Sequence, residues 1–224
     1  MSTGTLFIAA TPIGNLEDLS QRALRVLNEV DFVICEDTRV TQKLLQRYDV
    51  KKRLVSFHQH SRLARLDKMI EELQSGTSAA LVTDAGTPGV SDPGNQVVAA
   101  AVAAGIPIVP IPGPSAVTAL LSVAGFSVDR YTFLGFLPHK KGRETLLNEI
   151  ASSVYPVLLF ESPHRIVKTL EALAERLPEA KCVVGRELTK QFEEIIRGSL
   201  AEVSTVIAKR PSQKGEFVLL VAPS

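Results

Sequence analysis

Four short clusters hold the side chains of this 224-residue chain that are best suited to chemistry. TDAGTPGVSDPG, Thr83 to Gly94, sets two carboxylates among glycines and prolines, and CEDTR, Cys35 to Arg39, sets two carboxylates beside an arginine. ESPHR, Glu161 to Arg165, and PHKKGR, Pro138 to Arg143, add histidines and cations. Carboxylates and histidines can take a proton from a hydroxyl group, and lysine and arginine can hold phosphates.

Each cluster also has a purely structural interpretation. SDPG is typical of a helix start, with Ser91 or Asp92 as the N-cap and Pro93 at the first helical position. CEDTR is typical of an N-cap by Asp37 or Thr38 with a local ion pair, ESPHR of a capped helix start, and PHKKGR of an exposed turn. The sequence leaves both interpretations open for each cluster taken alone.

The elements that must position these clusters alternate between strand and helix patterns. Over about residues 1–115, short apolar segments predict strands and apolar residues at helical spacing predict helices, which together indicate a mostly parallel sheet covered by helices. The predicted strands are 5–10, 31–36, 53–58, 78–83 and 106–112, and the predicted helices are 19–30, 39–48, 64–76, 96–105 and 115–125. The prolines of the last of these strands suit a sheet edge or a strand end.

A second set of elements follows, and several of them could pair antiparallel. Strands are predicted at 130–137, 156–161, 181–187 and 215–222, helices at about 142–152 and 163–177, and a segment of unassigned type at about 192–208. The fold class is therefore α/β, with an N-terminal domain at 1–114 and a C-terminal domain with a mixed sheet at 115–224.

Three loops rich in glycine and proline follow the first, fourth and fifth predicted strands. They are Ala10–Ser20, Thr83–Gly94 and Pro112–Ala116. Ligands of open α/β sheets bind outside the carboxyl ends of the strands, so these loops predict a preformed pocket rich in backbone donors and carbonyls. PIGN in the first loop is neither a dinucleotide fingerprint nor a phosphate-binding P-loop.

Composition narrows the class of protein only a little. The formal net charge of +1 argues neither for nor against a nucleic-acid partner. Cys35 and Cys182 are expected to be free, buried thiols in a reducing compartment, and the spacing of His58 and His60 argues against a metal site. Without a signal-peptide pattern, and with no apolar run near the roughly 18–20 residues that span a bilayer, we expect a cytoplasmic protein without a membrane segment or a metal.

The order of motifs along the chain resembles a known family. TPIGNLEDLSQRAL, EDTRVT, DAGTPGVSDPG, PIPGPSA, GFLP, ESPHR and RELTK are similar to the motifs of the tetrapyrrole-methylase superfamily of S-adenosyl-L-methionine (SAM) enzymes. Within it they look most like the bacterial branch that 2′-O-methylates the ribose of a cytidine in the decoding centre of 16S rRNA. The resemblance runs from Thr5 to about Val221.

The resemblance implies two α/β domains with SAM in the cleft between them, a homodimer, and the small ribosomal subunit as substrate. Members of the branch usually continue past the last strand into a helical extension, whereas this sequence stops at Ser224. Backbone amides and carbonyls of glycine- and proline-rich loops suit the zwitterionic amino acid, the sulfonium and the adenine of SAM. By resemblance the cofactor contacts are Pro12, Asp84, Ala85, Gly86, Thr87, Pro88, Ser115, Ala116, Phe160 and Glu161.

A ribose hydroxyl is a poor nucleophile at neutral pH, so a base or a hydrogen-bond acceptor is expected beside it. Glu36 and Asp37 rank first because Arg39 next to them could hold a phosphate; Asp92, Glu161, His58 and His164 are the other candidates. The expected contacts to the RNA backbone are Lys140, Lys141, Arg143 and Arg165.

Two other functions stay open at this point. The chain could be a small-molecule methylase acting on a tetrapyrrole-type acceptor, which an enclosed apolar cleft would favour over a basic rim. It could also be a non-catalytic SAM-binding or ribosome-binding module, which would bind the cofactor without any transfer to subunits.

Overall fold

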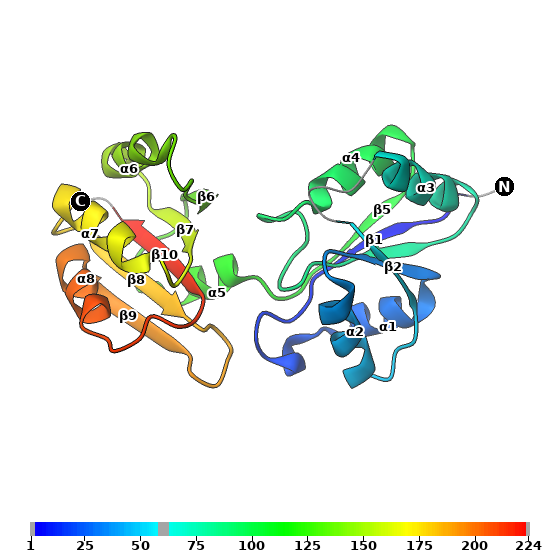
Figure 1. Ribbon diagram of the computed structural model, residues 1–224, viewed down its shortest axis with the longest axis horizontal. Coiled ribbons are helices and arrows are strands. Elements are labelled where there is room, and N and C mark those ends of the chain that lie inside the picture. Colours follow the sequence, from blue (N-terminus) through cyan, green and yellow to red (C-terminus); the bar gives the residue numbers. More distant parts are fainter. Residues whose placement is uncertain (1–2, 58–62, 223–224) are drawn as a thin grey trace. The chain divides into compact units, whose positions relative to one another are not determined.

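A computed structural model describes residues 3–57 and 63–222, and the chain divides into two compact units, Met1–Ser115 and Ala116–Ser224 (Figure 1). His58 and His60 lie outside the described residues. Each unit has its own sheet and its own core.

The first unit is built on a sheet of five parallel strands in the order β3-β2-β4-β1-β5. Its strands are β1 (Leu6–Ala9), β2 (Phe32–Cys35), β3 (Arg53–Ser56), β4 (Ala79–Leu81) and β5 (Ile108–Ile111). The parallel sheet predicted from the β-α alternation is confirmed. Of the two positions that suit the proline-containing strand, the structure shows the edge, because β5 is the terminal strand and Pro110 needs no donor on its open side.

Helices cover both faces of this sheet, as the strand residues require. The helices are α1 (Gln21–Glu29), α2 (Thr38–Arg47), α3 (Leu63–Gln74) and α4 (Gly94–Ala103), with a short 3₁₀ helix, η1 (Leu16–Asp18). Because side chains alternate along a strand, Val33 and Cys35 of β2 pack in the core under α1 and α2, while Phe32 and Ile34 pack under α3 and α4. Figure 1 shows these two helix pairs on opposite faces of the sheet.

The second unit has a mixed sheet in the order β6-β7-β10-β8-β9. Its strands are β6 (Thr132–Phe136), β7 (Val157–Glu161), β8 (Lys181–Arg186), β9 (Glu194–Ser199) and β10 (Phe217–Ala222). β6 and β7 are parallel, whereas β10 pairs antiparallel with both β7 and β8, and β9 pairs antiparallel with β8. The expected antiparallel pairing of this half is thereby confirmed.

Three helices of the second unit share one core with one face of its sheet. These are α6 (Arg143–Ser152), α7 (Ile166–Arg176) and α8 (Leu200–Ala208). The fourth, α5 (Ala116–Ser122), contacts β8 and β10 and places Leu120 against Gly185, where an added Cβ would lie 2.9 Å from Leu120 Cδ1. The segment at 192–208, whose type the sequence did not assign, consists of β9 and α8 joined directly at a capping box of Ser199 and Glu202.

Two expectations about single features can be checked in the fold. Cys35 and Cys182 are free and buried, as predicted. Across residues 3–57 and 63–222, no helix has the length and apolar character that a membrane crossing requires.

A buried charge network fixes the start of α7 on β7. The Glu161 side chain is fully buried, and its carboxylate accepts hydrogen bonds from Arg165 Nε (2.7 Å), Thr169 Oγ1 (2.6 Å) and the Ser162 amide (2.7 Å). Arg143 at the start of α6 donates to Thr169 Oγ1 (2.8 Å) and places its Nη1 3.8 Å from the carboxylate. A buried charge is tolerated only when it is paired in this way, so the network links α6, α7 and β7.

Replacing Glu161 by glutamine should destabilise the second unit, because two largely buried guanidinium groups would lose their counter-charge. We expect the free energy of unfolding in urea to fall by about 2–4 kcal/mol. Glu144→Gln is the matched control: its carboxylate pairs with Arg176 on the surface and is 75% exposed, so the loss should stay below about 1 kcal/mol. Equal losses in the two variants would contradict a stabilising role for the buried network.

Candidate functional site

The loops after β1, β4 and β5 are fastened to one another at the carboxyl edge of the first sheet. Thr11 and Gly86 exchange two backbone hydrogen bonds, of 2.9 and 3.1 Å. The Thr11 hydroxyl donates to the Thr83 carbonyl at 3.0 Å, and the Thr87 hydroxyl donates to the Pro114 carbonyl at 3.1 Å. The edge is therefore formed by fixed backbone before any ligand arrives.

Two glycines allow this close approach. Gly86 has a φ of +88°, in the left-handed region that L side chains rarely adopt, and a Cβ there would lie 3.3 Å from Ile13 Cγ2. A Cβ on Gly113 would lie 3.0 Å from the Cβ of Ala10. A side chain at either position would push the loops apart.

Asp92, one of the predicted catalytic carboxylates, stabilises its own loop by accepting hydrogen bonds from loop amides. Both of its carboxylate oxygens accept from the Gly89 amide at 2.9 Å, and Oδ1 also accepts from the Gly94 amide at 2.8 Å. Gly94 begins α4, so Asp92 takes the place of a side-chain cap, although Pro93 is the N-cap residue and supplies none itself. The helix-start interpretation of this stretch is thus confirmed, one residue later than expected.

Asp37 is also committed to local structure. It is the N-cap of α2, accepts from the Arg39 amide at 2.8 Å, and forms an ion pair of 2.6 Å with the exposed Arg39 guanidinium. Hydrogen bonds from the Arg39 side chain, then from its amide, lower the pKa of Asp37 to about 2. The N-cap and ion-pair interpretation of CEDTR is confirmed.

The ends of β2 and β4 bring a second carboxylate next to Asp37. Asp84 Oδ1 accepts a hydrogen bond of 3.2 Å from the Asp37 amide. Burial raises the pKa of Asp84; the Asp37 amide opposes this shift, and the negative charge of Asp37 adds to it. Glu36 lies exposed beside them. The prediction that Glu36 and Asp37 stand at a strand end is confirmed, and the fold brings Asp84 of the glycine-rich loop beside Asp37.

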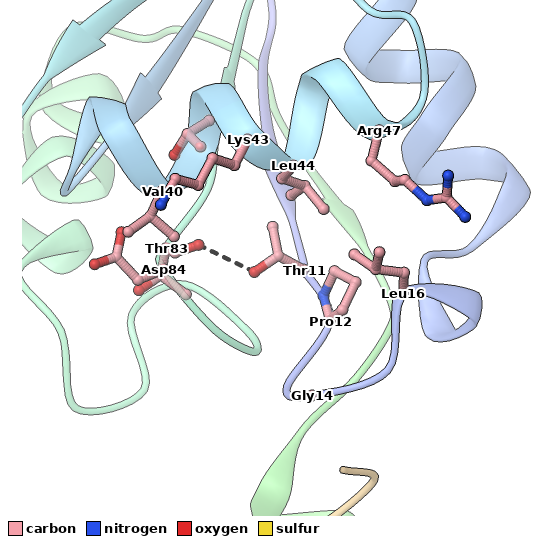
Figure 2. A pocket seen from close by; sticks show the side chains of 11 residues that line it. Thr11, Pro12, Gly14, Leu16, Val40, Lys43, Leu44, Arg47, Thr83 and Asp84 are labelled. Carbon is pink, nitrogen blue, oxygen red and sulfur yellow. Dashed lines mark hydrogen bonds between the residues drawn. The ribbon is translucent and has the colours of Figure 1, made fainter. Parts of the chain in front are cut away.

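A pocket of about 450 Å³ opens between α2 and the loop after β1, within the first unit (Figure 2). Its walls are mostly apolar, and three charged side chains line it. The charged lining residues are Lys43, Arg47 and Asp84, and the apolar ones include Pro12, Leu16, Val40 and Leu44. Its volume falls within the roughly 300–1,000 Å³ of small-molecule sites.

One hydrogen bond holds the far side of this pocket in place. Tyr48, which ends α2, donates its hydroxyl to the carbonyl of Leu16 in η1. The bond joins the loop after β1 to α2, so the distance between the two walls is fixed by the fold.

Phe160 and Glu161, the two cofactor contacts predicted in the second unit, have different surroundings. Phe160 stacks edge-on against Phe133, with ring centroids 5.1 Å apart, and tilts against Phe136 at 5.4 Å. The Glu161 carboxylate is fully buried within its hydrogen-bonded network.

The four cations predicted to contact RNA differ in how exposed they are. Lys140 and Lys141 are exposed, as expected of phosphate contacts. Arg143 and Arg165, expected in the same role, point their guanidinium groups at Glu161 and Thr169 instead. The cause is the buried carboxylate of Glu161, whose charge would be uncompensated without these two cations.

The other predicted residues can be placed briefly. Ser115 and Ala116 lie where the chain passes from the first unit to the second, and His164 is exposed before α7. Among the residues that the structure describes, no group of three or more histidine, cysteine, aspartate or glutamate side chains could hold a metal ion.

Sequence reasoning missed Lys43 and Arg47. The signal was present: Val40, Lys43, Leu44 and Arg47 follow the i, i+3, i+4, i+7 spacing that puts side chains on one helix face. Only the fold shows that this face of α2 meets the loop after β1 rather than open solvent.

Several bacterial proteins of similar sequence carry the same name. A "Ribosomal RNA small subunit methyltransferase I" of Mesorhizobium japonicum is 46% identical over 98% of this chain and 75% of its own length. Proteins with the same name from Xylella fastidiosa (47% identity; 99% of this chain and 82% of that protein) and Neisseria meningitidis serogroup B (43%; 99% and 77%) are similarly close.

Solved structures share the fold at low sequence identity. A diphthine synthase superposes with a TM-score of 0.73 at 17% identity, covering 98% of this chain and 90% of that one. A uroporphyrin-III C-methyltransferase from Thermus thermophilus, solved with S-adenosyl homocysteine, superposes with a TM-score of 0.66 at 17% identity, covering 97% of each chain.

The family profile of the tetrapyrrole (corrin/porphyrin) methylases matches residues 5–204, which is most of the chain. The two α/β units agree with the fold of the structural neighbours. Together with the identity to the bacterial relatives, this match means that the chain belongs to the tetrapyrrole (corrin/porphyrin) methylase family.

Proposed function

We propose that this chain transfers a methyl group from SAM to the ribose 2′-oxygen of a cytidine in the decoding centre of 16S rRNA, with the small ribosomal subunit as substrate. The observation that carries the proposal is the identity of 43–47%, over nearly the whole chain, to three proteins named for methylation of small-subunit ribosomal RNA. We also propose that the enzyme is a cytoplasmic homodimer, as the resemblance of its motifs implies.

The first unit fits SAM by the chemistry of its donors. The amide groups of Asp84 and Ala85 make no hydrogen bond within the described part of the chain, so they are available to a carboxylate or an adenine ring. Pro12 lines the pocket with apolar surface, Gly86 allows close backbone approach, and the buried Pro88 is proposed as a contact by resemblance. Thr87, Ser115, Ala116 and Phe160 complete the proposed contacts. SAM, when bound, supplies a methyl group made electrophilic by its sulfonium.

The chain must orient the ribose hydroxyl and accept its proton. Asp37 and Asp92 are occupied with N–H donors of their own loops, and a carboxyl group with a pKa of about 2 is a weak base. Asp84 lines the pocket as an exposed residue, and partial burial of its carboxylate raises its pKa, which makes it a stronger base than Asp37. We therefore propose Asp84 as the acceptor of the proton, with Glu36 as the competing residue and Arg39 as the support of Asp37.

The first experiment is methyl transfer from labelled SAM to purified small subunits that lack the modification. We expect one labelled ribose 2′-oxygen in the RNA, located by nuclease mapping. A label on a base, or label only on a small tetrapyrrole offered in parallel, would contradict the proposal. SAM binding by calorimetry without any transfer would point instead to a binding module.

Three carboxylate variants separate the candidate bases. We expect Asp84→Asn to lower kcat at least about 100-fold, because general base catalysis contributes roughly 10²–10⁴-fold. Asp37→Asn keeps an N-cap side chain and should stay within about threefold of wild type. If Glu36→Gln alone loses turnover while Asp84→Asn retains it, the base is Glu36; calorimetry of SAM binding controls for cofactor loss.

The pH dependence of Asp37 gives a further check on its role. Its pKa in the folded chain is lowered from 3.8 to about 2, so its contribution to stability is present above about pH 4 and is lost as the pH falls through about 2. Any ionisation seen in kcat between pH 5 and 9 must then belong to another group. A carboxyl titration of Asp37 near pH 4 by NMR would contradict this.

Lys140 and Lys141 are the proposed contacts to the RNA backbone in the second unit. Lys140→Glu with Lys141→Glu should weaken binding to small subunits and flatten its salt dependence, since each lost phosphate contact lowers the slope of log K against log salt by about 0.7–0.9. Lys181→Glu with Lys209→Glu, on exposed residues of β8 and of the end of α8, is the charge-matched control. A salt slope equal to that of the control would remove the two lysines from the interface.

A further inference from the structure

The pocket beside α2 combines an apolar body with a cationic rim. Val40 and Leu44 of α2 face Pro12 and Leu16 of the loop after β1, which gives two apolar walls. Figure 2 shows Lys43 and Arg47 leaving α2 toward different ends of this pocket. A site of this kind suits a ligand with an apolar or aromatic middle and an anion at each end.

The two cations are available to a ligand. Lys43 and Arg47 are exposed, and neither forms an ion pair with the part of the chain that the structure describes. Arg39 nearby is paired with Asp37, so it does not add to the rim charge. Against one carboxylate in the lining, Asp84, the two cations leave the pocket with a surplus of positive charge.

Their spacing follows from the helix. Lys43 and Arg47 are four residues apart, which separates them by about 6 Å along the axis of α2. One nucleotide within an RNA chain carries a phosphate on each side of its ribose, so a pair of cations about one turn apart can take both phosphates. Enzymes that act on a base take its nucleotide out of the stack into a pocket. Proteins also read RNA sequence mainly through unstacked nucleotides, so a pocket of this kind suits a single nucleotide of the substrate.

We propose that this pocket holds the target nucleotide of the RNA, with Lys43 and Arg47 on its two flanking phosphates and its base and ribose between the apolar walls. This inference rests on the proposed function and adds the place where the acceptor binds. It places the ribose in the same pocket as Asp84. The Tyr48 hydrogen bond to Leu16 fixes the distance between the two walls before RNA binds, which limits the entropic cost of ordering the site on binding.

The test compares Lys43→Ala, Arg47→Ala and the double variant with Lys68→Ala. Lys68 is an exposed lysine of α3, on the opposite face of the same sheet, and removes the same charge. Three quantities are measured: the Kd for unmodified small subunits by filter binding as a function of salt, KM and kcat for methyl transfer, and the Kd for SAM by calorimetry.

We expect each single variant to raise the Kd and KM for subunits about tenfold, the double variant to raise them more, and each lost contact to lower the salt slope by about 0.7. The Kd for SAM should stay within twofold of wild type. If the double variant binds and methylates subunits like Lys68→Ala, the pocket is not the nucleotide site, although the proposed function would stand.

A second variant tests the cavity itself without changing charge. Val40 is 40% exposed at the pocket wall, so Val40→Trp can fill the pocket without disturbing the core. We expect methyl transfer to fall at least tenfold with SAM binding retained, and unchanged transfer would overturn the proposal. Should wild type bind subunits but never methylate them, the proposed function fails, and the salt-dependent binding of the lysine and arginine variants still decides whether the pocket holds RNA.

Discussion

The backbone exchange between Thr11 and Gly86 is the constraint on which the rest of the binding edge depends. It joins the loops after β1 and β4, whose strands are neighbours in the sheet. The Thr11 hydroxyl adds a bond to Thr83, next to Asp84, so the acidic residue and the apolar wall at Pro12 are fixed by the same contact. Parallel strands place such loops at one edge, but hydrogen bonds between the loops decide their spacing.

The carboxylates at this edge of the sheet have two different roles, helix capping and contact with the pocket, and these roles account for the acidic residues in the loops. Asp37 and Asp92 satisfy amide groups at the beginnings of α2 and α4, groups that would otherwise lack partners. Asp84 accepts one amide and otherwise faces the pocket, where burial and the neighbouring charge of Asp37 favour its neutral form. The charge of Asp37 thereby adds to the effect of burial in raising the pKa of Asp84.

Most of the fold could be predicted from the sequence, because apolar spacing and glycine or proline breaks are local signals. The order of strands and helices, the edge position of the strand with Pro110, and the buried thiols all follow from such signals. The site was less predictable. Arg143 turns inward because Glu161 and Thr169, 18 and 26 residues further along the chain, meet it in space, and Lys43 joins the pocket because a distant loop packs beside its helix. Long-range contacts of this kind leave no mark in a short stretch of sequence.

The hydrogen bonds between these loops also set the stage of folding at which the first unit can bind a ligand. Thr11 and Gly86 are 75 positions apart, and the bond between Asp37 and Asp84 spans 47. Contacts of such high sequence separation form late in folding, because the loop-closure entropy must be overcome first. A growing chain that has made β1, β2 and α2 has all the cations and apolar walls of the pocket, but Thr83 and Asp84 are still to come. Ligand binding therefore reports the complete assembly of the first unit, and a fluctuation that releases the loop after β4 abolishes the site before the sheet itself comes apart.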